Sequence, residues 1–346
     1  MPISSRRAVG LLVVAMAAVA GAACGGSATA PAAPAVAVAS GQVFALMDPG
    51  ASASTLQAYA ALPSVDGLAF RVLWSSLEPA AGTYDWTALD TALAVARRQG
   101  KTITIHVAPS AGGLPGWLGS LGMRSYSYVG PQGPRTDPVP WDSVYLARYR
   151  AFVTAMGAHV RATGNMELVA SVSDPVPEPE MTIVGCQNHQ LTGGIAYDRA
   201  TYLAAWDSTI STYAGAFPGI RLFISSPIAF ICANDGNDGQ AFYTDVMRYA
   251  SSATGHAAVF AADLTALGSQ RMAQAASLPG APAVGLQTIW SYSSDPQNRM
   301  QGSLTDAVCH GWRLGARYFE IYQPDLSSAD ASVQAAIGSA RTGQGC

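Results

Sequence analysis

Charged side chains are scarce in this chain, and no stretch of it is strongly basic. Only 12% of the 346 residues are Asp, Glu, Lys or Arg, and the formal net charge is −3. No basic run is longer than the pairs Arg6-Arg7 and Arg97-Arg98. Binding to nucleic acid needs clustered Lys and Arg, so the composition excludes that class of protein. The hydrophobic share of 49% is ample for a large core.

Several motifs that are typical of cofactor sites or known catalytic centres are also missing. The sequence contains no G-x-S-x-G, no H-E-x-x-H and no C-x-x-C spacing. No Gly-rich phosphate loop follows the first predicted strand, where the text is Met47-Asp48-Pro49-Gly50. We therefore expect neither a metal nor a cofactor.

The N-terminus has the pattern of a bacterial export signal. Arg6-Arg7 precede an apolar run over residues 8–20, which is too short to span about 30 Å of hydrocarbon. Small residues then lead directly to Cys24, a pattern that resembles the lipobox of lipoproteins. We expect cleavage after residue 23 and a lipid on Cys24. The alternative is ordinary cleavage that leaves a free thiol.

The expected domain organisation follows from this signal. Residues 1–23 form the signal peptide, and the Ala- and Pro-rich residues 24–41 form a disordered tether. Residues 42–346 form one folded domain. The mature protein is thus expected outside the cytoplasm, anchored to a membrane through Cys24, in the periplasm or on the cell surface.

Apolar runs of strand length alternate with helix-period segments along the rest of the chain. The pattern predicts strands at 43–47, 67–74, 101–107, 167–173, 220–225, 257–262, 283–290 and 317–322. It predicts helices at 54–61, 87–99, 143–162, 199–216, 240–251, 269–277, 304–314 and 331–340.

Eight β/α units in order predict an α/β fold, a single (β/α)8 TIM barrel. Most strands are continuous apolar runs, as in a parallel sheet covered on both faces. Long loops follow the strands, while Gly100 alone separates one helix from the next strand. This asymmetry places the working surface at the carboxyl ends of the strands. An open doubly wound sheet is the alternative.

Four cysteines besides Cys24 are present: Cys186, Cys232, Cys309 and Cys346. An even number in an exported protein indicates two disulfides, for which three pairings are possible. We favour Cys186 with Cys232, because both follow neighbouring strands. Cys309 with Cys346 would then fasten the C-terminus to a helix.

The stretch 71–90, RVLWSSLEPAAGTYDWTALD, resembles the second β/α unit of clan A glycoside hydrolases, most of all the family 42 β-galactosidase-like barrels. An Arg and a Trp end a strand, and Leu-Glu-Pro, a Gly and Tyr-Asp-Trp follow before a helix. Residues 115–118, Pro-Gly-Trp-Leu, resemble the Pro-x-Trp-Leu segment of the same barrels. The resemblance implies hydrolysis of glycosidic bonds by two carboxyl groups.

Both carboxylate positions of the clan are altered here. The resemblance implies an Asn-Glu pair after the fourth strand, but the text offers Asp174, Glu178 and Glu180 in a Pro-rich loop. We take Glu180 as the acid, with Asp174 and Glu178 as rivals. The seventh strand carries Gln287 and no Glu, and an amide cannot form the usual glycosyl-enzyme ester.

The eighth strand supplies a second carboxylate. Period-2 alternation in residues 318–322 places Tyr318, Glu320 and Tyr322 on one face, toward the barrel interior. A buried carboxylate needs a partner, and Arg71 or His106 is placed to be one. Glu320 is therefore either the partner of Glu180 in catalysis or half of a structural ion pair.

Other residues at the predicted strand ends are candidates for binding sugar hydroxyls or stacking on sugar rings. These substrate-binding candidates are Arg71, Trp74, His106, Trp117, Gln287, Trp290 and Tyr322. For each, a structural role in the barrel or its loops is the alternative.

The sequence thus predicts an exported glycoside hydrolase that acts on an oligo- or polysaccharide through Glu180 and Glu320. A non-catalytic carbohydrate-binding lipoprotein on a degenerate glycosidase barrel is the second hypothesis. A barrel lyase that uses His106 as its base is the third. The expected partners are a carbohydrate and a membrane, without nucleic acid.

Overall fold

The computed structural model describes residues 40–108, 113–130, 133–173, 186–187, 190–191, 193–225, 236–269, 272 and 283–346. The chain divides into two compact units, Met1–Val38 and Ala39–Cys346. The first unit lies outside the described residues, as does Cys24. Within the described residues, no helix is both long and apolar enough to cross a membrane.

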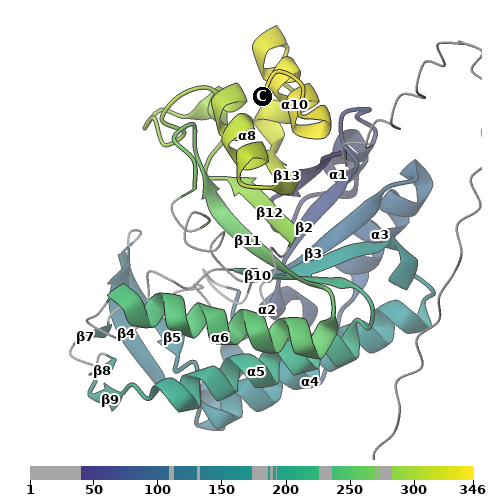
Figure 1. Cartoon of the computed structure of the whole chain (residues 1–346). Helices are drawn as coiled ribbons and strands as arrows, with labels where there is room; N and C mark the ends of the chain where they lie inside the picture. The colour runs from purple at the N-terminus through teal and green to yellow at the C-terminus, as the bar shows by residue number, and fades with distance from the viewer. Residues whose placement is uncertain are drawn as a thin grey trace, which may run out of the picture. The chain divides into compact units, whose positions relative to one another are not determined.

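Eight parallel strands close into a barrel in the second unit (Figure 1). In spatial order, β1 is followed by β13, β12, β11, β10, β6, β3 and β2, and β2 pairs with β1 again. The strands are β1 (Gln42–Met47), β2 (Gly67–Leu73), β3 (Thr102–Ala108), β6 (Val169–Ser173), β10 (Arg221–Ser225), β11 (Ala257–Leu264), β12 (Ala283–Thr288) and β13 (Ala316–Tyr322). The predicted (β/α)8 barrel is confirmed, and the open sheet is excluded by the closure.

Helices cover the outside of the barrel, and several begin at side chains that accept from the first free N–H groups. Asp142 and Asp198, for example, cap two of the long helices in this way. The helices are α1 (Ala53–Ala60), α2 (Trp74–Leu77), α3 (Thr87–Gln99), α4 (Ser143–Ala162), α5 (Arg199–Ala216), α6 (Gly236–Thr254), α8 (Leu304–Arg313), α9 (Gln323–Leu326) and α10 (Ala331–Thr342). Helices α4, α5 and α6 lie side by side (Figure 1).

The structure differs from the predicted elements mainly at the carboxyl ends of the strands. Strand β2 ends at Leu73 and passes directly into α2, and β12 ends at Thr288. The long loops hold small antiparallel sheets that the sequence did not predict: β4 (Ser125–Gly130) with β5 (Gly133–Pro138), and β7 (Cys186–Gln187), β8 (Gln190–Leu191) and β9 (Ile195–Ala196). Three 3-10 turns, η1 (Gly116–Leu121), η2 (Met166–Leu168) and η3 (Tyr292–Ser294), complete the loops. The helix predicted at 269–277 falls mostly outside the described residues.

Part of the barrel interior is filled by a compact apolar cluster that is separate from the core between strands and helices. Its buried members are Phe44, Leu46, Ala69, Phe223, Ala258, Phe260 and Tyr318. Gly285 belongs to the same layer, because a Cβ there would lie 2.6 Å from the Phe223 ring. The aromatic filling leaves the polar residues of the interior nearer the carboxyl ends of the strands.

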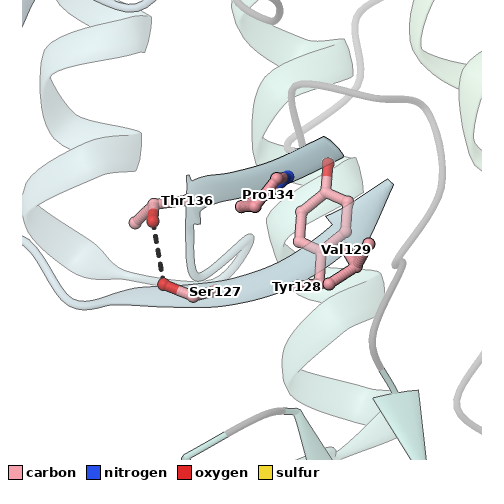
Figure 2. A pocket seen from close by; sticks show the side chains of 5 residues that line it. All are labelled: Ser127, Tyr128, Val129, Pro134 and Thr136. Atoms are coloured by element: carbon pink, nitrogen blue, oxygen red, sulfur yellow. Dashed lines mark hydrogen bonds between the residues drawn. The ribbon is translucent and has the colours of Figure 1, made fainter. Parts of the chain in front are cut away.

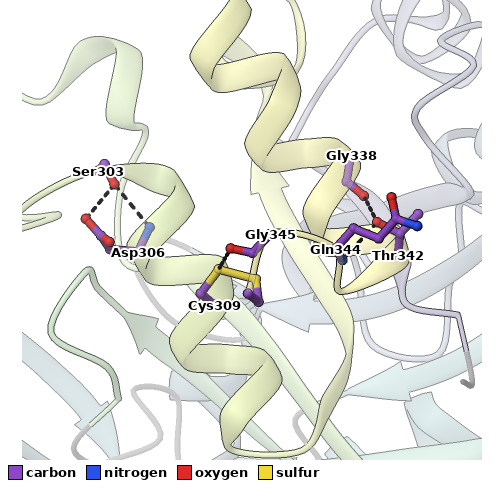
Figure 3. Close-up of a disulfide and its surroundings, with 8 residues drawn as sticks. Ser303, Asp306, Cys309, Gly338, Thr342, Gln344 and Gly345 are labelled. Atoms are coloured by element: carbon purple, nitrogen blue, oxygen red, sulfur yellow. Dashed lines mark hydrogen bonds between the residues drawn. A yellow bond between two sulfur atoms is a disulfide. The ribbon is translucent and has the colours of Figure 1, made fainter.

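A disulfide joins Cys309 of α8 to Cys346, with the two Cα atoms 4.8 Å apart (Figure 3). This is one of the two pairs that we favoured. Cys232 and the side chain of Cys186 lie outside the described residues, so the second pair stays a prediction. The bond ties the last residue of the chain to the outside of the barrel next to α10.

Gly285→Ala is expected to lower the free energy of unfolding by about 1–3 kcal/mol, because the added methyl group overlaps the Phe223 and Phe260 rings. Gly215→Ala is the matched control. Gly215 is exposed near the end of α5 and no atom approaches its Cβ position. It should leave stability within about 1 kcal/mol of wild type, on the stabilising side. Equal urea midpoints for the two variants would contradict this packing.

Candidate functional site

Glu320 is the central polar residue of the barrel interior. Its side chain is 0% exposed. The Nε2 atom of His106 lies 2.7 Å from Glu320 Oε1, and the hydroxyl of Tyr318 donates to the same oxygen at 2.6 Å. A carboxylate oxygen only accepts, so Nε2 of His106 carries the proton of the first bond. Of the two partners expected for Glu320, the structure selects His106.

Tyr318 extends the hydrogen-bond chain inward. Its hydroxyl also lies 2.7 Å from Thr104 Oγ1, which in turn lies 2.6 Å from Ser171 Oγ. A phenol has one proton, and because the carboxylate takes it, Thr104 must donate to Tyr318. Burial, and next the charge of Glu320, raise the pKa of Tyr318 well above its ordinary value. The phenol therefore stays protonated and holds Glu320 Oε1 at any physiological pH.

Several polar groups around Glu320 have no hydrogen-bond partner among the described residues. These include the second oxygen of Glu320, Oε2, and the hydroxyl of Ser173. The strand register pairs Ser173 with His106 and Gln287 with Glu320. The side chain of Gln287 is partly exposed. An unpaired buried polar atom costs about 1–3 kcal/mol, so these atoms are open to a further hydrogen-bond partner.

Aromatic and cationic side chains surround the mouth at the ends of β2, β12 and β13. Trp290 is 36% exposed, and its ring centroid lies 5.7 Å from that of Tyr322. Arg299 places its guanidinium carbon 4.4 Å from the Trp290 centroid. Arg299 thus shares the Trp290 ring, which we had expected to serve either in sugar stacking or in a structural role.

Arg71 is bound at the end of β1 and does not contact Glu320. Its Nη2 donates to Asp48 Oδ1 at 2.7 Å, and its Nε donates to the carbonyl oxygen of Met47 at 3.0 Å. Burial raises the pKa of Tyr322, while the positive charges of Arg71 and Arg299 oppose that rise. Both arginines therefore act on the same phenol at the rim.

Trp74 was expected at the mouth, and this expectation is wrong. Its side chain is fully buried in α2, with Tyr149 and Phe152 of α4 at centroid distances of 5.3 and 5.6 Å. Its Nε1 donates to Glu78 Oε2 at 2.7 Å. The helix that starts at Trp74 turns the ring outward from the barrel into the helical layer. No ring face is left for a sugar.

Trp117 is a loop anchor that keeps some exposure. Its Nε1 donates to the backbone oxygen of Glu78 at 2.9 Å, and its ring meets Trp74 edge to face. The carboxylate of Glu78 is itself buried, accepting from Trp74 and from the N–H of Gly82 at 2.8 Å. Glu78 therefore joins α2 to two loops.

The loop after β12, which carries Trp290 and Arg299, is held by a residue that we did not predict. Asp325 of α9 is fully buried. Its carboxylate accepts from the hydroxyl of Ser291 and from the backbone N–H groups of Tyr292 and Ser293, at 2.7 to 3.0 Å. The sequence signal was the Asp three residues after Tyr322, at the start of a short helix.

The other half of the predicted catalytic pair cannot be placed. Asp174, Glu178 and Glu180 lie outside the described residues, directly after the end of β6 at Ser173. The role of Glu180 therefore stays a prediction. Among the described residues, no group of three or more His, Cys, Asp or Glu side chains is arranged to hold a metal ion.

A separate hollow of about 340 Å³ lies on the β4 and β5 hairpin (Figure 2). It is lined by Ser127, Tyr128, Val129, Pro134 and Thr136. Figure 2 shows the hydroxyls of Ser127 and Thr136 bridging the two strands, 2.8 Å apart. None of the lining residues carries a charge, so this hollow has no acid or base for chemistry.

Comparison with known proteins gives one sequence match and several structural ones. The profile of the glycoside hydrolase family 42 β-galactosidases matches residues 69–126. A comparison with curated proteins gave no match. The catalytic domain of a β-amylase from Paenibacillus polymyxa has a TM-score of 0.59 at 11% identity, covering 88% of this chain and 100% of that one. A β-galactosidase from Marinomonas ef1 has a TM-score of 0.57 at 14% identity, covering 86% of this chain and 59% of that one.

The fold is the (β/α)8 barrel that these solved structures share. The resemblance inferred from residues 71–90 is supported by the family 42 match, which runs from β2 into β4. The matched segment contains Arg71, His106 and Trp117, but neither Gln287 nor Glu320. The sequence match therefore covers the first part of the barrel, from β2 into β4.

Tyr318→Phe is expected to lower the free energy of unfolding by about 1.5–3 kcal/mol, because it removes a hydrogen bond to a buried charge. Tyr243→Phe is the control. Tyr243 is also fully buried, and its hydroxyl donates to the neutral carbonyl of Ile224 at 3.1 Å. We expect a cost of about 0.5–1.5 kcal/mol for this variant. Equal costs in urea unfolding would contradict the stronger bonding that we assign to the Tyr318 hydroxyl.

Proposed function

We propose that the protein hydrolyses glycosidic bonds of an oligo- or polysaccharide at the carboxyl ends of its barrel strands. The observation that carries this proposal is that the described residues bind only one of the two carboxylate oxygens of Glu320. One carboxylate oxygen is fixed by His106 and Tyr318, while Oε2 has no partner among the described residues. A purely structural carboxylate would have both oxygens satisfied.

Glycoside hydrolysis needs one carboxylic acid to protonate the leaving oxygen and a second carboxylate as nucleophile or base. In our proposal Glu180 is the acid and Glu320 is the second group. His106 and Tyr318 donate to Oε1, which leaves Oε2 to face the substrate. Gln287 of β12 pairs in register with Glu320 of β13, and its amide N–H donates to the substrate. A separation of about 5–5.5 Å between the carboxyl groups would give retention, and about 6.5–9.5 Å inversion.

A non-catalytic carbohydrate-binding protein is the second candidate, and two observations favour it. Glu320 is 0% exposed in the absence of a ligand. Strand β12 carries Gln287 where the resemblance implies a nucleophilic Glu. On this alternative, the polar layer binds sugar hydroxyls and releases no product.

The test is a hydrolysis assay on a panel of oligo- and polysaccharides, with reducing ends counted and products analysed by mass spectrometry. Glu320→Gln and Glu180→Gln are each expected to lower kcat at least about 100-fold. Glu178→Gln and Asp174→Asn test the rival acids. Glu167→Gln is the matched control, since Glu167 pairs with Arg97 on the exposed surface.

The outcomes separate the three hypotheses. Loss of activity in the Glu320 variant, with retention in the Glu167 variant, supports hydrolysis at this site. Glycan binding without any product from the wild-type protein favours the binding protein. Unsaturated products identify a lyase, and His106→Gln would then abolish them.

We also propose that Cys24 anchors the protein to a membrane. A bacterial host grown with labelled palmitate should incorporate label into the wild-type protein. Cys24→Ser should lose the label and move from the membrane fraction to the soluble fraction, because a lipid anchor is the only membrane attachment that we propose. Label that persists in this variant would disprove the anchor at Cys24.

A further inference from the structure

Arg299 is a cation at the mouth whose charge is not neutralised by an ion pair among the described residues. Its guanidinium lies over Trp290, with 4.4 Å between the guanidinium carbon and the ring centroid. Burial acts to raise the pKa of the nearby Asp295, but backbone N–H groups, including that of Met300 at 2.6 Å from Oδ2, and the charge of Arg299 lower it. Arg299 and Asp295 thus attract each other without a direct ion pair, so the N–H groups of Arg299 can still bind a ligand.

Arg71 offers further donors on the same rim. Its bonds to Asp48 and to the Met47 carbonyl use two of the five N–H groups of the guanidinium. The Arg71 side chain is 27% exposed. Arg299 lies over Trp290, whose ring centroid is 5.7 Å from that of Tyr322, and the charges of both arginines act on the Tyr322 phenol, so both lie near the same part of the mouth.

The loop that carries Arg299 is fixed before any ligand arrives. Asp325 holds its start through Ser291, Tyr292 and Ser293. Its end returns through Asn298 and Gln301, which have positive φ angles of 51° and 56°. Non-glycine residues adopt this conformation only when the surrounding structure holds them there. A fixed cation costs little entropy on binding, which favours specific recognition.

We propose that the glycan recognised at this mouth is acidic and carries a uronic acid carboxylate, bound by Arg299 and the free N–H groups of Arg71. A guanidinium binds a planar carboxylate through two parallel hydrogen bonds and a charge–charge attraction, whereas neutral hydroxyls offer it weaker, single hydrogen bonds. Trp290 and Tyr322 then contact the apolar face of the same sugar. This inference rests on the proposed function for its site, but it concerns recognition and holds for a binding protein as well.

The experiment compares each acidic polysaccharide with its carboxyl-reduced form, which has the same sugars and linkages without the charge. Polygalacturonate, glucuronoxylan and alginate, with their reduced counterparts, are suitable probes. Binding is measured by calorimetry on the folded domain and hydrolysis by product analysis. For the acidic polysaccharide that binds, we expect affinity about tenfold higher than for its reduced form, and this preference should shrink as salt rises.

Two variants and one control assign the preference to this rim. Arg299→Gln should lower the ratio of acidic to neutral affinity about tenfold. Asp48→Asn removes the negative charge paired with Arg71 and should raise the ratio, and because Asp48 is 71% exposed this variant should fold normally. Arg317→Gln is the matched control. Arg317 lies 3.8 Å over the Trp312 ring, near the opposite end of β13, and its loss should not change the ratio.

The outcomes distinguish this inference from the proposed hydrolysis. Hydrolysis or binding of neutral glycans without any preference for the acidic forms overturns the inference and leaves the function intact. A preference for acidic forms that depends on Arg299, with no product from any substrate, supports the inference and overturns hydrolysis. A preference that survives both Arg299→Gln and Asp48→Asn unchanged also overturns the inference.

Discussion

The burial of one carboxylate constrains the whole interior of this barrel. Glu320 is out of contact with water, and its charge is tolerated because His106 and Tyr318 both donate to one of its oxygens. His106 lies on β3 and Glu320 on β13, so the bond crosses the barrel between strands that are not neighbours. A shift of either strand by one residue would turn that strand's own member of the pair, His106 or Glu320, from the barrel interior to the helical side. The polar cluster therefore fixes register as well as a site.

The segment that most resembles the family 42 enzymes serves mainly as a structural joint. Its Glu78 binds Trp74 and the N–H of Gly82, and its backbone oxygen receives the indole N–H of Trp117. These contacts seat the end of β2 against α4 and the loop after β3. Likeness in this segment therefore concerns the architecture, whereas the two carboxylates that we propose for catalysis lie on β13 and after β6, outside the matched residues.

Local periodicity was enough to predict the eight strands and the inward face of β13, because alternation in Tyr318, Glu320 and Tyr322 depends only on neighbours in sequence. It was not enough for contacts across the barrel. The choice between His106 and Arg71 as the partner of Glu320 depends on register between distant strands, and Asp48 decides it by occupying Arg71. Trp74 was misplaced because the chain leaves β2 one residue earlier than predicted and enters a helix.

The closure of the barrel between β1 and β13 also governs the order in which the molecule can fold. Strand β1 is the first barrel strand to be synthesised, and one of its two neighbours is β13, the last barrel strand to be synthesised. During synthesis or passage through a translocation pore, β1 therefore exposes an unpaired edge and much apolar surface. The barrel can close only after β13 has been made, and the Cys309 to Cys346 bond forms later along the chain. With the export that we propose for this chain, the barrel therefore closes after translocation.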